Sequence, residues 1–420
     1  MSSDTMDTEE LFEQPLIIRL PIFDRDKSIW GYEFISNELF PPSIASEGSP
    51  LSNLISVYKN AMSSLGVELS AEKKLFLNIT NQEYLDNADL SEGWENCVFG
   101  MCQEVAYSCQ CAGFVDSMVE KGACLSVDSD VAPEFFEQLV EKCDIVKVSL
   151  AGKLPAEIVK IRHEFKAVGC ELMATDIVNW EAFEGTRALG FRYFQGPFFT
   201  VPQVEKDREL SAGAIAKLQL LKELGNPDCD MEELSGIIAS DVSLSYRILK
   251  YINSASFGLK NQIRSIQQAV SLIGLKELKH WATVVVMSDL DTTHKGEELA
   301  YMALQRGRFL SNLAQSNKEI EHSSNTMFML GLFSKLDAMM SYPMDKCLED
   351  IPLDDDLKDG LCGVLNEFRD WLMMLDAVEI GNWGIGSEIL GRYGVNFTVA
   401  ATQYMKAASW AAHQLPNMKG

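Results

Sequence analysis

The sequence lacks an excess of positive charge: 36 Lys and Arg stand against 61 Asp and Glu, which gives a net charge of −25. Binding to nucleic-acid phosphates or anionic lipids needs a basic face, so we expect neither nucleic acid nor a membrane surface as a partner. Long apolar runs are also missing, since the longest, about residues 281–287, is far short of a membrane span. The N-terminus carries acids where a signal peptide has bases. These absences predict a cytoplasmic protein.

Metal-binding patterns are scarce. The ten cysteines include no CxxC pair, and no histidine lies within their one cluster, which consists of Cys97, Cys102, Cys109 and Cys111. A reduced compartment suits this number of cysteines, and we favour packing over a metal site for the cluster.

A length of 420 residues predicts more than one domain. The first half alternates short apolar runs with helical patterns at 104–121, 133–142, 155–168 and 180–189. Eight runs lack the alternation of a half-exposed sheet, which indicates strands buried on both faces. They are PLIIRLPIF, IWGYEFI, KLFLNI, CVFGMC, ACLSVD, DIVKVSL, CELMATDI and FRYFQG. Strands that are mostly followed by helices predict a TIM-like (β/α)8 barrel.

From residue 212 the pattern is helical almost throughout. Asp230 and Glu233 form the capping-box pattern of a helix start, and the glycine-rich stretch 381–391 is interpreted as a loop. Arg306 and Arg308 are expected mainly to pair with acids, and partner docking is the alternative. The predicted organisation is an acidic tail (1–14), a barrel (15–203), a linker (204–211) and an all-helical bundle (212–420).

A barrel of this type places functional side chains at the carboxyl ends of its strands. Glu33, Asn78 and Asp128 at these ends are potential ligands for a hard divalent cation. Lys147 could orient a phosphate or a water, or could simply pair with Asp128. A few polar residues that cap the strands are an equally open interpretation.

The order RLPIFDRDKSIWGYEFIS, LFLNIT, VKV and GFRYFQGPFFTVP resembles the EAL domain, a cyclic-di-GMP phosphodiesterase barrel, over roughly residues 15–203. This resemblance implies that certain residues match the metal-binding and catalytic positions of that family. They are Glu33, Asn78, Asp128, Lys147 and Gln195.

Other positions depart from the family pattern. Ligand, general-base and substrate-binding residues of the family are replaced here at Leu20, Asn37, Met101, Ser129, Thr175 and Val178. With about three carboxylate ligands gone, the domain is expected to bind no metal and to have no catalytic residue; Mg²⁺ or Mn²⁺ would be a cofactor only if the barrel kept residual activity. Binding of cyclic-di-GMP is not expected either, and the five matching residues are interpreted as relics or as an internal polar network.

The second half resembles the HDOD domain, a helical relative of the HD phosphohydrolases. The resemblance rests on LSGIIASDVSLSYRILKYINSASFG, IRSIQQAVSLIGLKELKHWATVV and MALQRGRFLSNLA, and it extends nearly to the end. Ser334 and Lys335 stand where an HD pair would be, and a lysine repels a metal ion. Together the two halves resemble the EAL–HDOD signalling proteins of the YuxH-like group, with both domains degenerate.

These features predict a catalytically inactive bacterial signalling or scaffold protein that acts through protein partners, with a homodimer as one possibility. Two alternatives stay open. The first is a sensor that binds cyclic-di-GMP or another small ligand without hydrolysing it. The second, last in order, is a weak cyclic-di-GMP phosphodiesterase.

Overall fold

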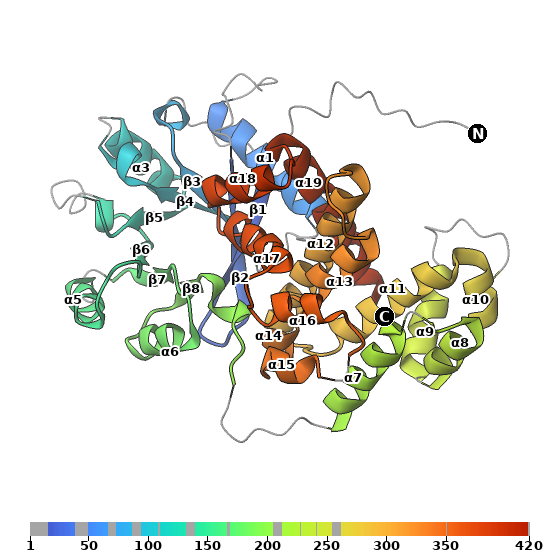
Figure 1. Ribbon diagram of the computed structural model, residues 1–420. Coiled ribbons are helices and arrows are strands. Elements are labelled where there is room, and N and C mark those ends of the chain that lie inside the picture. The colour runs from blue at the N-terminus through green and yellow to red at the C-terminus, as the bar shows by residue number, and fades with distance from the viewer. Residues whose placement is uncertain are drawn as a thin grey trace. The chain divides into compact units, whose positions relative to one another are not determined.

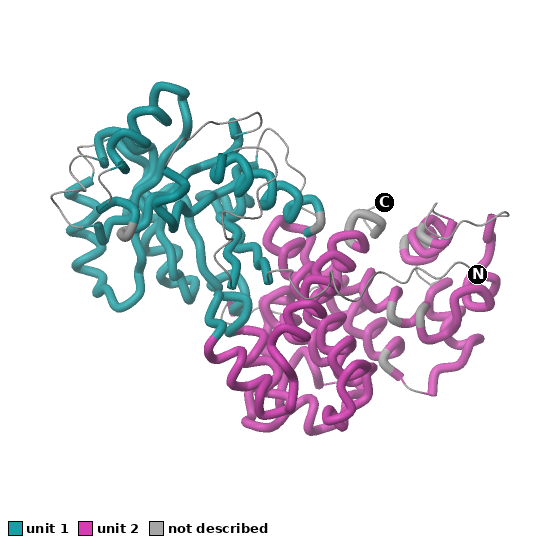
Figure 2. The backbone as a smooth tube through the Cα atoms, turned by 90° about the horizontal axis from the view of Figure 1, so that it is seen from above, with its two compact units in different colours: residues 1–201, 377–383 teal, residues 202–376, 384–420 magenta. Residues whose placement is uncertain are grey.

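The structure is a computed structural model that divides into two compact units, residues 1–201 with 377–383 and residues 202–376 with 384–420 (Figure 2). It describes residues 16–37, 49–65, 73–85, 94–107, 110–131, 139–165, 169–204, 212–226, 228–240, 242–253, 262–349 and 351–418. The predicted acidic tail 1–14, Cys109 and all but the first residue of the predicted linker 204–211 lie outside these residues. So does most of the predicted helix at 133–142.

The first unit contains a closed barrel of eight strands in sequential order, which confirms the predicted barrel (Figure 1). Each predicted apolar run contributes one strand. The strands are β1 (Ile17–Phe23), β2 (Ile29–Ser36), β3 (Lys74–Ile79), β4 (Cys97–Met101), β5 (Cys124–Asp128), β6 (Ile145–Ser149), β7 (Glu171–Thr175) and β8 (Tyr193–Gln195). The helices of this unit are α1 (Pro50–Ser64), η3 (Gln82–Tyr84), α2 (Gln103–Ala106), α3 (Cys111–Glu120), α5 (Pro155–Phe165), α6 (Trp180–Ala188) and η4 (Pro197–Thr200).

One strand departs from a TIM-like barrel. β2 to β8 run parallel in sequence order, but β1 is antiparallel to both β2 and β8. The reason is local, because a turn rather than a helix joins β1 to β2. The Asp24 carboxylate accepts the N–H of Asp26 and of Ser28, both at 2.9 Å, and Lys27 takes a left-handed φ of 63°. So short a connection can return the chain only antiparallel.

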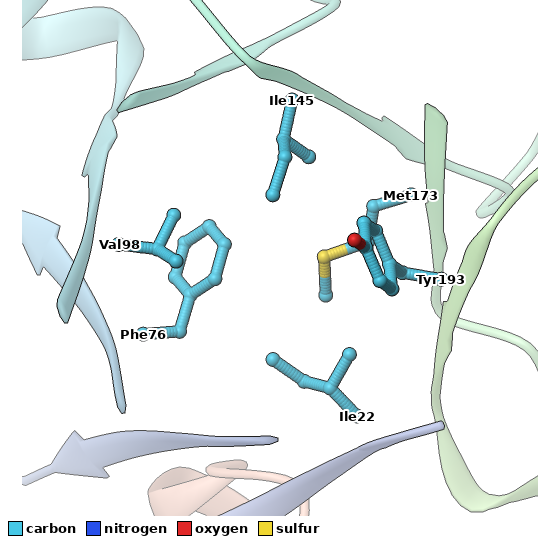
Figure 3. Packing of buried hydrophobic residues seen from close by; sticks show 6 residues of the cluster. All are labelled: Ile22, Phe76, Val98, Ile145, Met173 and Tyr193. Carbon is cyan, nitrogen blue, oxygen red and sulfur yellow. The ribbon is translucent and has the colours of Figure 1, made fainter. Parts of the chain in front are cut away.

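The barrel interior is filled by side chains from most of its strands. Ile22, Phe76, Val98, Ile145, Met173 and Tyr193 point into the barrel and form one buried cluster (Figure 3). Because side chains alternate along a strand, this cluster also fixes which later residues of each strand face inward. Asn78 therefore lies on the same face as Phe76, Gly100 as Val98, and Lys147 as Ile145.

The second unit is helical, as predicted. Its helices, together with those that continue past residue 377, are α7 (Ala212–Gly225), α8 (Met231–Ser240), α9 (Val242–Ile252), α10 (Ile266–Ile273), α11 (Leu275–Ser288), α12 (His294–Ser316), α13 (Ser324–Phe333), α14 (Leu336–Met340), α15 (Met344–Cys347), α16 (Asp355–Leu361), α17 (Glu367–Val378), α18 (Trp383–Arg392) and α19 (Phe397–Met418). The capping box at α8 is confirmed. The Glu233 N–H donates to Asp230 Oδ1 at 2.9 Å, and the Asp230 N–H donates to Glu233 Oε2 at 3.3 Å.

The interpretation of 381–391 as a loop is wrong, since α18 occupies most of this stretch. Glycines cost a helix roughly 1 kcal/mol each relative to alanine, which is why the sequence favoured a loop. Ile389 and Leu390 are buried, however, and burying two such side chains contributes more than the glycines cost. Tertiary packing therefore overrides local propensity at α18.

α12 and α13 approach closely at two glycines. A Cβ on Gly307 would lie 2.8 Å from the Phe328 carbonyl oxygen, and one on Gly331 would overlap the backbone of Arg306 and Gly307. Small residues at this crossing let the two backbones come together. The neighbouring side chains of α12 are thereby held in fixed positions.

We predict that Gly331→Ala lowers the free energy of unfolding by about 1–3 kcal/mol, because the methyl group pushes α12 and α13 apart. Urea unfolding followed by circular dichroism measures this change. Gly236→Ala is the matched control: a Cβ there meets no atom within 4 Å, so the helix α8 should gain up to about 1 kcal/mol. Equal effects of the two substitutions would contradict the close approach.

Candidate functional site

Four of the five predicted site residues of the barrel lie together. We call Glu33, Asn78, Lys147 and Gln195, which come from β2, β3, β6 and β8, the Glu33 cluster. The Glu33 side chain is buried, and Gln195 Nε2 donates to its Oε2 at 2.6 Å. Its Oε1 accepts hydrogen bonds from Asn78 Nδ2 and, at 3.3 Å, from Lys147 Nζ. Both oxygens of the carboxylate are thus held by protein donors.

Lys147 is the cation of this cluster. Burial disfavours its charge, but the nearby carboxylates of Glu33 and then Asp128 outweigh burial, so the pKa of Lys147 is raised. Its Nζ also lies 4.8 Å from the centre of the Phe76 ring and 3.5 Å from Asn78 Oδ1. The sequence offered Asp128 as one partner of Lys147. In the structure Lys147 pairs with Glu33, and the charge of half-buried Asp128 also raises the pKa of Lys147.

Three of the replaced positions serve the barrel itself. Leu20 lies opposite Glu33 in the β1–β2 register. Asn37 Oδ1 accepts the N–H of Leu16 at 2.9 Å and so closes the end of the same strand pair. The Ser129 hydroxyl donates to Asp130 at 3.3 Å. None of the three presents a carboxylate to the Glu33 cluster.

The inward position of β4 is Gly100, not Met101. A Cβ on Gly100 would lie 2.7 Å from Asn78 Oδ1, whereas Met101 belongs to the opposite face of the strand and is fully buried. Glycine leaves the space that the Asn78 side chain fills. Once Val98 is known to face the barrel interior, Gly100 is known to face it too, because the two are two residues apart.

At the end of β7 the structure adds an acid that the sequence analysis did not single out. Thr175 is buried at the strand end, and Asp176 follows it with a left-handed φ of 57°. The Asp176 carboxylate accepts hydrogen bonds from Ser149 Oγ and, at 3.4 Å, from Thr175 Oγ1. Val178 lies beyond the strand and is 60% exposed. The only sequence signal for Asp176 is an acid directly after a strand.

The residues present do not fit the pair of divalent cations that an EAL-type barrel implies. Such ions need several carboxylates around one point. Within the part of the chain that the structure describes, no three Asp, Glu, His or Cys side chains are grouped for a metal ion. Glu33 is already held by an ammonium and two amides, which compete directly with a cation for its oxygens.

The helical unit has a second charged group, which we call the Asp376 cluster. It consists of buried Arg306 and Lys335, half-buried Ser334, and Asp376, whose side chain is 44% exposed. Arg306 Nη2 donates to Asp376 Oδ1 at 2.6 Å, and Lys335 Nζ donates to the same oxygen at 3.3 Å. Arg306 Nη1 also donates to Ser334 Oγ at 3.3 Å. The prediction that Arg306 pairs with an acid is confirmed, and the acid is Asp376.

The electrostatics of this cluster are dominated by its two cations. Arg306 is 1% exposed and Lys335 is 8% exposed, so both charges are held out of water. Burial alone would raise the pKa of Asp376, but Lys335 and then Arg306 outweigh it and lower the pKa well below its usual range. Ser334 and Lys335, which stand where an HD pair would be, thus belong to a network in which Arg306 and Lys335 both pair with Asp376.

The pattern of this helical unit also matches a known family. Residues 215–346 match the family model of the HDOD domain. This part of the chain is an HDOD domain. The match contains Arg306, Ser334 and Lys335, whereas Asp376 lies beyond it in α17.

Two relatives match nearly the whole chain. The uncharacterized protein YuxH of Bacillus subtilis is 25% identical over 413 residues, which are 96% of this chain and 99% of that protein. The cyclic di-GMP phosphodiesterase CdgJ of Vibrio cholerae is 23% identical over 411 residues, 96% of this chain and 94% of that protein. Similarity to YuxH was predicted from the sequence and is confirmed.

Solved structures with EAL domains are similar as well. The Bacillus subtilis YkuI protein, which has an EAL domain and was solved with substrate cyclic-di-GMP and calcium, is 16% identical with a TM-score of 0.35. The matched region covers 64% of this chain and 75% of that chain.

Among the described residues, no helix combines the length and apolar character that crossing a membrane requires.

We predict that Lys147→Met lowers the free energy of unfolding by about 3 kcal/mol, because Glu33 then keeps a buried negative charge without its cation. The double variant Glu33→Gln with Lys147→Met removes both charges and should recover part of this loss. Urea unfolding of the two single variants and the double variant gives the coupling between the residues. Additive effects would contradict the ion pair.

We predict that Asp376→Asn lowers the free energy of unfolding by about 1–2 kcal/mol at neutral pH. Two buried cations lose the carboxylate that both contact, and water partly screens that carboxylate because its side chain is 44% exposed. The wild-type pKa of Asp376 is lowered, so its stabilisation is complete above the ordinary aspartate pKa of about 3.9 and is lost as the pH falls below it. The difference in the free energy of unfolding between wild type and variant should therefore be constant from pH 7 to about 4 and should become smaller below pH 4.

Urea unfolding over this pH range measures the difference. Glu388→Gln is the matched control, since Glu388 pairs with Arg392 at 2.7 Å on an exposed surface and should contribute less than about 1 kcal/mol. An Asp376→Asn effect as small as this control would show that water, not the carboxylate, solvates the two cations.

Proposed function

We propose that this protein is a non-catalytic regulator in bacterial cyclic-di-GMP signalling, which works in the cytoplasm and acts by binding protein partners, with self-association as one possible mode. The observation that carries the proposal is the Glu33 cluster, in which Lys147, Asn78 and Gln195 take both oxygens of the carboxylate. A metal-dependent phosphodiesterase needs that carboxylate, and others beside it, free to hold cations.

The Asp376 cluster supports the same proposal from the helical unit. Hydrolysis at an HD-type site needs neutral imidazoles and carboxylates around a metal. Here Arg306 and Lys335 place two positive charges around a single carboxylate oxygen. Neither of the two sites is therefore equipped for hydrolysis, and regulation by binding is the activity that a chain with both domains can still perform.

The connection to cyclic-di-GMP rests on CdgJ, the phosphodiesterase that is similar to this chain over nearly its full length. The same similarity also favours the alternative of a weak phosphodiesterase. The alternative of a non-hydrolysing sensor is favoured by the five family positions that this barrel keeps. One purified preparation can separate all three functions.

We predict no hydrolysis of cyclic-di-GMP above the buffer rate in the presence of Mg²⁺ or Mn²⁺, because the ligands for the cations are missing. Chromatography of the linear product measures the rate, and CdgJ assayed in parallel is the positive control. Hydrolysis that Glu33→Ala abolishes would overturn the proposal and establish the phosphodiesterase.

Calorimetry with cyclic-di-GMP tests the sensor. Under the proposal no heat of binding is measured at cyclic-di-GMP concentrations up to about 100-fold above a typical micromolar dissociation constant. Saturable binding that Glu33→Ala weakens, without hydrolysis, would establish a sensor in place of a regulator that acts only through protein partners.

A further inference from the structure

A polar pocket in the helical unit is independent of both charged clusters. It has a volume of about 450 Å³ and lies between α12 and α19. Its lining comes from two helical stripes, one on each helix, with residues spaced three or four apart so that they share a face. The lining residues are Arg308, Asn312, Gln315, Ser316, Gln403, Lys406 and Trp410.

The composition of this pocket is unusual for the chain. The protein carries a net charge of −25, yet the pocket contains two cations and no acid. The Arg308 guanidinium lies over the Trp410 ring at 5.3 Å from its centre. No ion pair between either Arg308 or Lys406 and a carboxylate is found among the residues that the structure describes.

The contrast with Arg306, two residues earlier on α12, is informative. Arg306 is buried and its charge is balanced by Asp376. Arg308 faces the pocket, and the sequence prediction that it pairs mainly with acids is not met there. A chain with so many carboxylates could easily have placed one beside Arg308, so the positive charges in this pocket are available to an anion from outside.

The walls of the pocket are held in place by packing on the other side of the same helices. Phe309 of α12 and Tyr404 of α19 are both buried and meet edge to face with ring centres 5.4 Å apart. The polar stripes therefore sit on a rigid base, which reduces the cost of ordering them around a ligand.

We propose that this pocket binds a purine mononucleotide. Arg308 and Lys406 offer two cations for a phosphate, and the Trp410 ring offers a base the aromatic surface that the Arg308 guanidinium leaves uncovered. The amides of Asn312, Gln315 and Gln403 supply both donors and acceptors for the edge of a base or for ribose hydroxyls. A volume of about 450 Å³ lies within the range of small-ligand pockets.

A nucleic-acid strand fits this site less well than a single nucleotide. Outside the pocket, residues 204–420 carry 29 acids against 19 bases, and a polyanion would be repelled by that surface. An acidic peptide could use the two cations, but it would leave Trp410 and the three amides without a matching group. The combination of aromatic ring, cations and amides therefore favours a nucleotide.

Isothermal titration of the full-length protein with GMP and with AMP tests the proposal. We predict one site per chain for at least one of the two nucleotides. Arg308→Gln and Lys406→Gln should each weaken binding about tenfold or more, since each removes a charged contact to phosphate. Trp410→Leu should weaken it too, whereas Lys346→Gln, an equal charge change at an exposed residue of α15, should leave it unchanged.

Two further titrations sharpen the result. Inorganic phosphate alone should bind much more weakly than the nucleotide, because it cannot use Trp410. Absence of heat with both nucleotides up to millimolar concentration would overturn the proposal, as would tighter binding of a poly-glutamate peptide or equal binding by the Lys346→Gln and Arg308→Gln variants. Because the pocket is separate from the Glu33 and Asp376 clusters, this outcome is independent of the hydrolysis assay.

Discussion

The need to neutralise buried charge governs both units of this protein. In the barrel the Glu33 carboxylate is buried and is balanced by Lys147, with two amides that complete its hydrogen bonds. In the helical unit the charges are reversed, and Asp376 balances two buried cations. An ion pair out of water contributes little net stability, but losing one partner is costly, so each group is fixed once it is formed.

Much of the barrel could be predicted from the sequence, because its eight buried strands are short, continuous apolar runs. The side chains that face the barrel interior were harder to predict from the sequence. The register that puts Gly100, and not Met101, beside Asn78 depends on which residues of β4 face the core. The helix α18 was missed because its glycines oppose helix formation and only the burial of Ile389 and Leu390 compensates.

The counterions of the buried charged residues were harder still to predict from the sequence. The acid that balances Arg306 lies 70 residues further along the chain, and no local pattern connects the two. The same holds for Glu33 and Lys147, which are 114 residues apart. The sequence shows where a charged residue falls along a helix or a strand, but its burial and the identity of its counterion are properties of the packed fold.

The antiparallel β1 strand has a consequence for synthesis of the chain. β1 can pair with β2 as soon as the short turn between them has formed, yet its other edge must wait for β8, whose register places Gln195 beside Ile22. Until then the β1–β2 hairpin presents an open edge, and such edges pair readily with other chains. Closing the ring therefore needs the contact between the first and the last strand, and the edge of β1 stays open to other chains until β8 has been synthesised.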